Sequence, residues 1–289
     1  MRKINTIQKF KSPIHFRYCA ILSLSLILLT SFQLLAQDFT KEDELRGTVT
    51  EDRAWWDVQH YNLKVEVFPE SKSISGTNTI TYKVLDEDKM MRIDLQAPMV
   101  IKKITQNGKK LKYKTKGNFH YIKFKKAAAI GSEHSITIAF SGAPKEAVRA
   151  PWDGGFSWKK DDNGNHFIAT ANQGIGASVW WPCKDHPSDE PDKGVDLAIT
   201  APSSLMGVGN GRLISEVDNG ETKTWNWKVT QPINNYGVNV NVGDYTHFGY
   251  KHEGLNGMLD VDYYVLSDNL DKAKEQFNQV PLMLNAFEY

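Results

Sequence analysis

The sequence predicts an all-β fold, in the form of a large antiparallel β-sandwich or saddle-like domain. Many short segments are rich in β-branched and aromatic residues and alternate between apolar and polar positions, as half-buried strands do. Asn-Gly pairs, which are typical of tight hairpin turns, lie between several of these segments. No amphipathic helix of convincing length occurs before residue 267, whereas a parallel α/β sheet would need helices between its strands.

The individual strands are expected where the alternation is clearest. In chain order they are 58–68, 74–85, 91–95, 100–105, 119–124, 135–140, 167–171, 195–200, 213–217, 222–229, 238–242, 246–250 and 258–265. The turn pairs are Asn107-Gly108, Asn163-Gly164, Asn210-Gly211 and Asn219-Gly220. Together these elements make up one domain that we place at residues 55–266.

The N-terminus has the order of a signal peptide over residues 1–36. Basic residues precede an uncharged apolar stretch over 18–35, and the small residue Ala36 follows, so we expect cleavage after Ala36. An uncleaved membrane anchor is the alternative, because the apolar stretch is nearly long enough to span a bilayer. The sequence therefore predicts export to the periplasm, the cell surface or the extracellular space.

Composition and charge narrow the classes of function. The 289-residue chain is 40% hydrophobic and 24% charged, as in a globular protein. Loss of the leader would change the net charge from +1 to about −4, which does not suggest nucleic-acid binding. Cys183 would then be the only cysteine, and we expect it to be a buried small hydrophobe. The polar, acid-rich stretch 37–54 is expected to be a flexible arm.

A helix is expected at the end of the chain, over residues 267–289. Ser267 and Asp268 could cap its start, and Leu270, Ala273, Phe277 and Val280 repeat at helical spacing. Pro281 should bend it. Its apolar face would need a packing partner.

The stretch 170–187, with the sequence TANQGIGASVWWPCKDHP, is the leading candidate for a functional loop. Its glycines suggest tight turns, and Pro182 and Pro187 exclude a regular helix. It could be a loop that aromatic residues pin beneath a sheet. Alternatively it lines a ligand site, with Gln173 as the polar contact.

The sequence contains no motif that would form a catalytic site by itself. There is no His-Glu-x-x-His pair, phosphate loop or nucleophile elbow, and Gly254 and Gly257 make a turn more natural than a helix after His252. A metal cluster at Asp185, His186 and Asp189 is a minor alternative to a self-capping loop. Another alternative is a sugar-stacking platform built from Trp152, Trp158, Trp180 and Trp181.

Several motifs, taken in order, resemble the N-terminal β-domain of the aminopeptidase N and leukotriene hydrolase family of zinc metallopeptidases. The segment Asp57–Leu63 resembles the opening strand of that family, and Ile74–Ile80 its continuation. Pro232–Tyr236 and Val242–Tyr245 resemble a Tyr-rich strand that ends in Gly-Asp. The strongest match is Trp181–Pro187, which looks like an aromatic-Pro-Cys-x-Asp-x-Pro signature. Thr170 also matches, whereas Ala171 and Asn172 depart from the usual Gln and Cys.

The resemblance implies the N-terminal, substrate-side domain of a zinc metalloaminopeptidase that removes N-terminal residues from peptides. Gln173 falls on the Gln or Glu that helps to hold the free amino terminus of the substrate. The zinc ligands would lie in a catalytic domain beyond Tyr289, of which 267–289 would be the first helix. We therefore expect a truncated chain with no catalytic or metal residues of its own, inactive by itself. Its partners would be peptide substrates and its own catalytic domain.

Two other functions stay open at the level of sequence. The chain could be a non-catalytic relative in the same family that acts as an interaction scaffold. It could also be an exported carbohydrate-binding β-sandwich that uses its tryptophans. A membrane partner is expected only if the leader is not cleaved.

Overall fold

A computed structural model describes residues 40–88 and 90–289. The predicted signal peptide, 1–36, and the start of the predicted arm lie outside these residues. The chain divides into two units between Glu44 and Leu45, and the second unit, 45–289, contains all of the strands among the described residues. Within the described residues, no helix is both long enough and apolar enough to cross a membrane.

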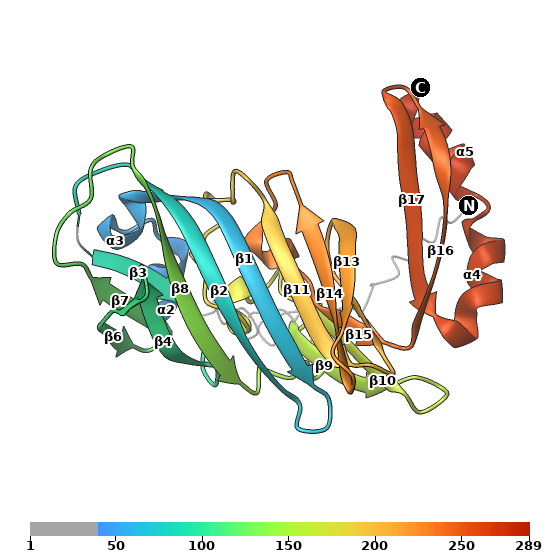
Figure 1. The fold of residues 1–289 in the computed structure, drawn as a ribbon, viewed down its shortest axis with the longest axis horizontal. Helices are drawn as coiled ribbons and strands as arrows, with labels where there is room; N and C mark the ends of the chain where they lie inside the picture. The colour runs from blue at the N-terminus through green and yellow to red at the C-terminus, as the bar shows by residue number, and fades with distance from the viewer. Residues whose placement is uncertain (1–39, 89) are drawn as a thin grey trace, which may run out of the picture. The chain divides into compact units, whose positions relative to one another are not determined.

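The predicted all-β class is confirmed, and the strands fall close to the predicted segments (Figure 1). Their bounds are β1 Trp56–Phe68, β2 Ser73–Val84, β3 Met90–Asp94, β4 Val100–Gln106, β5 Lys109–Lys110, β6 Tyr113–Lys116, β7 Phe119–Lys123, β8 Glu133–Gly142, β9 Gly155–Lys160, β10 His166–Ala171, β11 Val195–Pro202, β12 Met206–Val208, β13 Arg212–Asp218, β14 Thr222–Val229, β15 Asn241–Gly243, β16 Tyr245–Gly254 and β17 Gly257–Leu266. The helices are α2 Lys41–Gly47, α3 Glu51–Ala54, α4 Leu270–Phe277 and α5 Val280–Glu288, with short 3-10 turns at Ala177–Val179, Asn235–Gly237 and Ser267–Asn269.

The largest sheet has eight strands in the order β13-β14-β11-β1-β2-β8-β4-β5 (Figure 1). Most of its pairs are antiparallel, but β1 and β11 run parallel, from Tyr61 opposite Val195 to Glu66 opposite Thr200. The predicted antiparallel arrangement describes the other pairs of this sheet, and β1 with β11 is the exception. A parallel neighbour needs a long crossover connection, and alternation within a strand carries no information about its neighbour's direction.

One face of the eight-stranded sheet is buried and the other is polar. Along β11, Val195, Leu197, Ile199 and Ala201 are buried, and the residues between them are partly exposed. On the polar face the hydroxyl oxygens of Thr79 and Thr137 lie 2.9 Å apart across neighbouring strands. The alternation that predicted the strands therefore separates a core face from a solvated face.

Smaller sheets complete the fold. They are a four-stranded sheet, β12-β15-β10-β9, a three-stranded sheet, β3-β7-β6, and the hairpin β16-β17. Trp158, Ile168 and Val242 of the four-stranded sheet belong to the same buried cluster as residues of the large sheet. The expected strand 238–242 is shorter than predicted, because β15 begins only at Asn241.

Three of the four Asn-Gly pairs connect paired strands. They are Asn107-Gly108 between β4 and β5, Asn163-Gly164 between β9 and β10, and Asn219-Gly220 between β13 and β14. Asn210-Gly211 is different, because β12 pairs with β15 and β13 pairs with β14. Gly211 still needs a positive φ of 82°, so the pair marks a turn without a hairpin.

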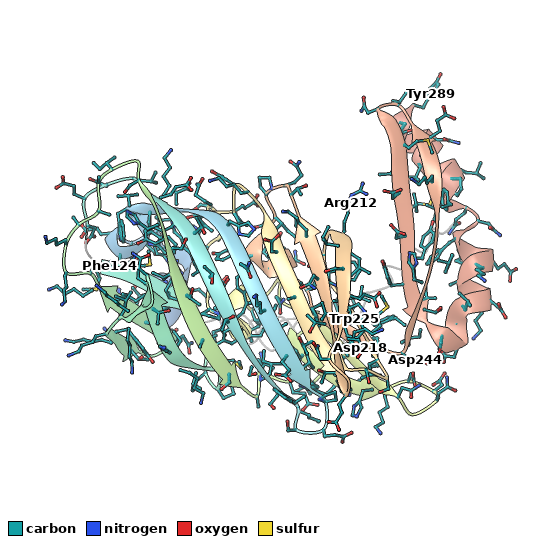
Figure 2. All side chains as sticks on the ribbon, viewed as in Figure 1. Phe124, Arg212, Asp218, Trp225, Asp244 and Tyr289 are labelled. Atoms are coloured by element: carbon teal, nitrogen blue, oxygen red, sulfur yellow. The ribbon has the colours of Figure 1, made fainter. Side chains whose placement is uncertain are left out.

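The C-terminal helical prediction is confirmed as two helices separated near Pro281, which lies in the first turn of α5. The predicted cap at Ser267 is wrong, because Ser267 lies in a 3-10 turn and its hydroxyl donates to Asp244, between β15 and β16 (Figure 2). Tyr263 of β17 supplies the packing partner that the apolar face needed. The ring of Phe277 stacks on the Tyr263 ring, with 4.6 Å between centroids.

Candidate functional site

Gln173 lies at the tip of a tight turn that follows β10. The Asn172 carbonyl accepts hydrogen bonds from the amides of Ile175, at 3.2 Å, and Gly176, at 2.8 Å. Asn172 itself is buried, and its side-chain amide donates to the Val238 carbonyl. Gln173 and Gly174 are exposed. The turn therefore has a fixed base and presents the Gln173 side chain outward.

Asp185 fixes the far end of the same turn. Its carboxylate accepts hydrogen bonds from the amides of Ala177, at 3.2 Å, and Ser178, at 3.1 Å, and from the Ser178 hydroxyl at 2.6 Å. Burial raises the pKa of Asp185, and these hydrogen bonds act in the opposite direction. The sequence offered Asp185 as a candidate metal ligand. In the structure its carboxylate oxygens instead accept hydrogen bonds from backbone amides.

Two side chains hold the middle of the turn through one carbonyl. The Ile175 oxygen accepts from Gln96 Nε2 at 2.7 Å and from Arg46 Nη1 at 3.0 Å. Gln96 also donates to the Ser178 hydroxyl oxygen at 3.1 Å. The backbone on both sides of Gly174 is therefore tied to other parts of the molecule.

A buried charge cluster lies behind the turn. Asp94 pairs with the guanidinium groups of Arg53 and Arg92, and all three side chains are almost fully buried. Arg53 also donates to the Asp185 carbonyl at 3.1 Å, and Asp94 accepts from the Asp185 amide at 3.0 Å. Removal of one member would leave a buried charge without its partner. The free energy of unfolding would fall by about 3–5 kcal/mol.

The flexible arm predicted for 37–54 is wrong for its last ten residues. Arg53 lies in α3 and is fully buried, and Arg46 and Leu45 are half-buried. Composition led to the error, because acid-rich stretches usually stay solvated. Here buried carboxylate and carbonyl groups elsewhere in the chain bind the arginines of this stretch.

The Trp-Pro-Cys half of the signature has a structural role, as one of the two interpretations predicted. Trp180, Trp181 and Cys183 are fully buried, and Trp181 meets Tyr61 edge to face with 4.9 Å between ring centroids. Cys183 pairs with Asp94 through two backbone hydrogen bonds of 2.9 and 3.2 Å. Burial raises the pKa of the Cys183 thiol, so this cysteine is protonated and unreactive.

Lys184 is the one charged residue of the signature that lies deep in the protein. Its ammonium group pairs with Asp189, donates to the Trp56 carbonyl and lies 4.6 Å from the centroid of the Trp56 ring. Burial lowers the pKa of Lys184, while the Asp189 carboxylate opposes that shift. The pair anchors the chain that comes after the turn.

The metal cluster considered at Asp185, His186 and Asp189 does not form. Asp185 binds backbone amides, Asp189 pairs with Lys184, and His186 Nδ1 lies 2.7 Å from the Ser188 hydroxyl. In the described part of the chain, no group of three or more His, Cys, Asp or Glu side chains could hold a metal ion. The residues present therefore do not fit a zinc site.

The tryptophan platform also fails as a shared surface. Trp180 and Trp181 have exposed fractions of 0%, and Trp158 has 9%. Trp152 alone is open to solvent, with an exposed fraction of 89%. The four rings do not form one face on which a sugar could stack.

Gln173 borders a hollow of about 280 Å³. Backbone or side-chain atoms of the following residues line it: Arg46, Gly47, Gln173, Gly174, Gly176, Asp185, His186, Pro187, Asn234, Asn235 and Tyr236. Asn235 is buried and donates to the Lys184 carbonyl at 2.8 Å. Among the described residues, no hydrogen bond engages the Gln173 side chain, so its amide is available to a ligand.

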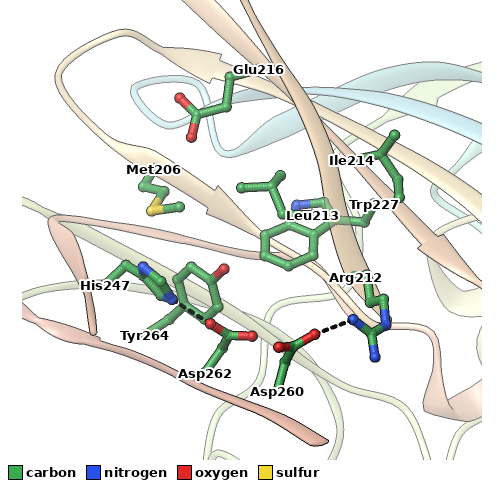
Figure 3. A pocket seen from close by; sticks show the side chains of 11 residues that line it. Met206, Arg212, Leu213, Ile214, Glu216, Trp227, His247, Asp260, Asp262 and Tyr264 are labelled. Carbon is green, nitrogen blue, oxygen red and sulfur yellow. Dashed lines mark hydrogen bonds and ion pairs between the residues drawn. The ribbon is translucent and has the colours of Figure 1, made fainter. Parts of the chain in front are cut away.

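A larger hollow, of about 630 Å³, lies between the hairpin β16-β17 and the strands β13 and β14 (Figure 3). Four of its titratable groups pair with one another: Arg212 with Asp260 at 2.5 Å, and His247 with Asp262 at 2.7 Å. Another, Glu216, pairs with Lys223 outside the hollow. Trp227 and Tyr264 form an aromatic wall, with 5.3 Å between ring centroids. None of the predicted site residues lies here, and the paired charges leave no side chain poised for chemistry.

Comparison with known proteins identifies the class to which this β-domain and turn belong. The sequence profile of the peptidase M1 N-terminal domain matches residues 57–236, which is more than half of the chain. The chain belongs to this family, and hence to the M1 zinc metallopeptidases. No match was found among curated proteins.

Solved structures share the fold at low sequence identity. An M1 zinc metallopeptidase from Deinococcus radiodurans superposes with a TM-score of 0.65 at 18% identity, covering 74% of this chain and 48% of its own. A mutant form bound to a Tyr-Ser-Ala substrate gives 0.64 at 18% identity, covering 74% and 49%. A two-domain M1 zinc metallopeptidase mutant bound to L-arginine gives 0.64 at 19%, covering 74% and 48%. The chain spans about half the length of these proteins.

Proposed function

We propose that this chain is the N-terminal, substrate-side domain of an exported zinc metalloaminopeptidase. In this role it contributes a contact to the free amino terminus of a peptide. The zinc and its ligands belong to a catalytic domain that comes after the described residues. Hydrolysis thus requires both domains, and the chain alone has no activity.

The observation that carries the proposal is the state of Gln173. Its side chain lies at the rim of a hollow, on a turn fixed at Asn172, Ile175 and Ser178, and it has no partner among the described residues. A fixed turn holds an amide oxygen in one place, so that a substrate ammonium group can meet it without ordering the backbone first. The resemblance to the metallopeptidase family implies the same role for this position and so supports the proposal.

The chemistry assigned to the chain is binding and orientation. The Gln173 oxygen accepts a hydrogen bond from the ammonium group and so sets how far the peptide enters the site. A neutral amide holds a cation less strongly than a carboxylate does. The zinc would be held by residues of the catalytic domain, and it would there provide an activated water for attack on the peptide carbonyl.

Export is the part of the proposal that rests on sequence alone. Residues 1–36 carry the signal-peptide pattern, and they lie outside the described residues. N-terminal sequencing of the secreted or periplasmic protein tests this point. A mature chain that begins at Gln37 supports cleavage after Ala36.

The test of Gln173 uses the protein extended through its catalytic domain. Gln173→Ala should lower kcat/KM for aminoacyl substrates about tenfold, which is the worth of one hydrogen bond to a charged group. Gln173→Glu should restore or exceed wild-type kcat/KM, because it replaces a neutral acceptor with a charged one. Unchanged kinetics in Gln173→Ala would contradict the proposal that Gln173 contacts the amino terminus of the substrate.

The two alternatives have distinct outcomes. A non-catalytic scaffold would show no hydrolysis even in the extended wild-type protein, and its sequence beyond Tyr289 would lack His-Glu-x-x-His. A carbohydrate-binding module would change its tryptophan fluorescence on titration with glycans. Burial of Trp180 and Trp181 argues against the second alternative.

A further inference from the structure

Arg46 gives the hollow beside Gln173 a second recognition group. We propose that this hollow prefers peptides whose N-terminal residue carries a carboxylate, with the Arg46 guanidinium as the partner of that carboxylate. The inference rests on the proposed function of Gln173, because it takes the ammonium group to lie at that residue. It specifies which kind of side chain the N-terminal residue of the peptide substrate carries.

The Arg46 charge has no counter-ion within the described residues. Its Nη1 donates to the Ile175 carbonyl at 3.0 Å, and no carboxylate oxygen of the described chain lies within 4.0 Å of its guanidinium. Three other arginines are paired. Arg53 and Arg92 both pair with Asp94, and Arg212 pairs with Asp260.

The position of Arg46 places it in the same hollow as Gln173. Both residues line it, and Arg46 is bonded to the carbonyl of Ile175, two residues after Gln173 in the same turn. Arg46 is also half-buried, so its charge is less well screened than that of a fully exposed arginine. A ligand at Gln173 therefore lies within the field of the guanidinium.

The other charged groups around the hollow are already engaged. Asp94 pairs with both Arg53 and Arg92. Both Asp185 oxygens are engaged by the Ala177 and Ser178 amides, so Asp185 cannot turn to neutralise Arg46. A guanidinium without a counter-ion disfavours a basic side chain in the ligand and favours an acidic one.

The geometry of arginine suits a carboxylate in particular. A guanidinium has five N–H donors, and the bond to Ile175 leaves donors free for a two-point contact with a carboxylate. At about 280 Å³ the hollow lies below the typical range for drug-sized ligands, about 300–1,000 Å³. It therefore suits one residue of a peptide.

Binding of short peptides to the chain tests the inference. The probes are Glu-Ala, Gln-Ala and N-acetyl-Glu-Ala, with the backbone amides of Gly174 and Gly176 followed by NMR. We expect Glu-Ala to bind about tenfold more tightly than Gln-Ala, the worth of a charge-assisted contact. Arg46→Gln should abolish this difference, so that Glu-Ala and Gln-Ala bind the variant with equal affinity even if the lost bond to the Ile175 carbonyl weakens both. Arg46→Lys should retain part of it, because the charge stays while the two-point geometry is lost.

The control is Arg212→Gln, which removes an arginine from the other hollow and should leave the preference intact. Near-UV circular dichroism of Arg46→Gln checks that the variant is folded; if it is not, Arg46→Lys alone decides. Equal affinity for Glu-Ala and Gln-Ala in the wild type, or no binding of either peptide, would overturn the inference. So would a preference that persists in Arg46→Gln, or one that is undiminished in Arg46→Lys where that variant decides. Acetylation reports separately on Gln173. If N-acetyl-Glu-Ala binds as well as Glu-Ala, the ammonium contact fails while the acid preference stands.

Discussion

The Ser178 hydroxyl donates a hydrogen bond of 2.6 Å to the Asp185 carboxylate, and the Ser178 amide donates a second one to the same oxygen at 3.1 Å. These two residues lie at opposite ends of the Trp-Trp-Pro-Cys segment. Their contact closes that segment into a loop and fixes the turn that carries Gln173. Asp185 is therefore a positioning residue for the candidate site.

Asp185→Asn should lower the free energy of unfolding by about 1–3 kcal/mol, because an amide offers one acceptor oxygen where three donors now converge. Peptide binding at Gln173 should weaken as well. Urea denaturation and the NMR titration measure the two effects. Asp161→Asn is a matched control, since Asp161 also caps backbone amides, in the exposed β9-β10 turn. It should leave peptide binding unchanged.

Gly176→Ala should destabilise the protein by about 1–3 kcal/mol. Gly176 has a φ of +86°, and a Cβ there would lie 2.2 Å from Asp185 Oδ2. Gly174→Ala is the comparison, because its Cβ would meet nothing within 4 Å and its φ lies outside the left-handed region. That variant should stay within about 0.5 kcal/mol of wild type. Equal thermal shifts for the two variants would contradict this account of the turn.

Trp181→Ala should cost about 3–5 kcal/mol, as large-to-small changes of a buried tryptophan do. Trp181 is fully buried against Tyr61, whereas Trp152 is 89% exposed. Trp152→Ala should change the free energy of unfolding by no more than about 0.5 kcal/mol. Chemical denaturation of both variants separates a core role from a surface role. A mild effect at Trp181 would reopen the ligand-platform hypothesis.

The protein should lose stability as the pH falls below 6.5, in part through His120. Burial lowers the pKa of His120 below 6.5, so the folded state binds fewer protons than the unfolded chain in that range. Its contribution to stability is therefore present at pH 7.5 and declines as the pH falls through 6.5 toward the folded pKa. The pH dependence of the unfolding free energy should be shallower in His120→Gln. Replacement of the exposed His247 by Gln leaves His120 in place and serves as control. An unaltered slope in His120→Gln would contradict the assignment.

The sequence was sufficient for what depends on local pattern. Alternation located β1, β2, β8 and β11, and the motif around Trp181 and Cys183 led to the family. The parallel pairing of β1 with β11 was not accessible, because it depends on which strands meet and not on the composition of either one.

The site was predicted only in part for the same physical reason. Gln173 came from the family motif, and the glycines of the loop indicated tight turns, of which Gly176 has a positive φ. Arg46 and Arg53 were missed because their partners, the Ile175 carbonyl and Asp94, are remote in sequence. No periodicity links an arginine in an acid-rich segment to a carboxylate some forty residues away.

Cys183 offers a way to measure motion at the candidate site. Its thiol is buried while its backbone pairs with Asp94. A thiol reagent can therefore reach Cys183 only when the segment around this residue separates from Asp94. In a chain with Cys19 replaced by Ser, the rate of labelling would measure how often that separation occurs, without unfolding the rest of the domain. A peptide that binds to the turn should lower the labelling rate, and a variant that loosens the turn should raise it. The buried cysteine would thus let motion at the site be timed in an otherwise native protein.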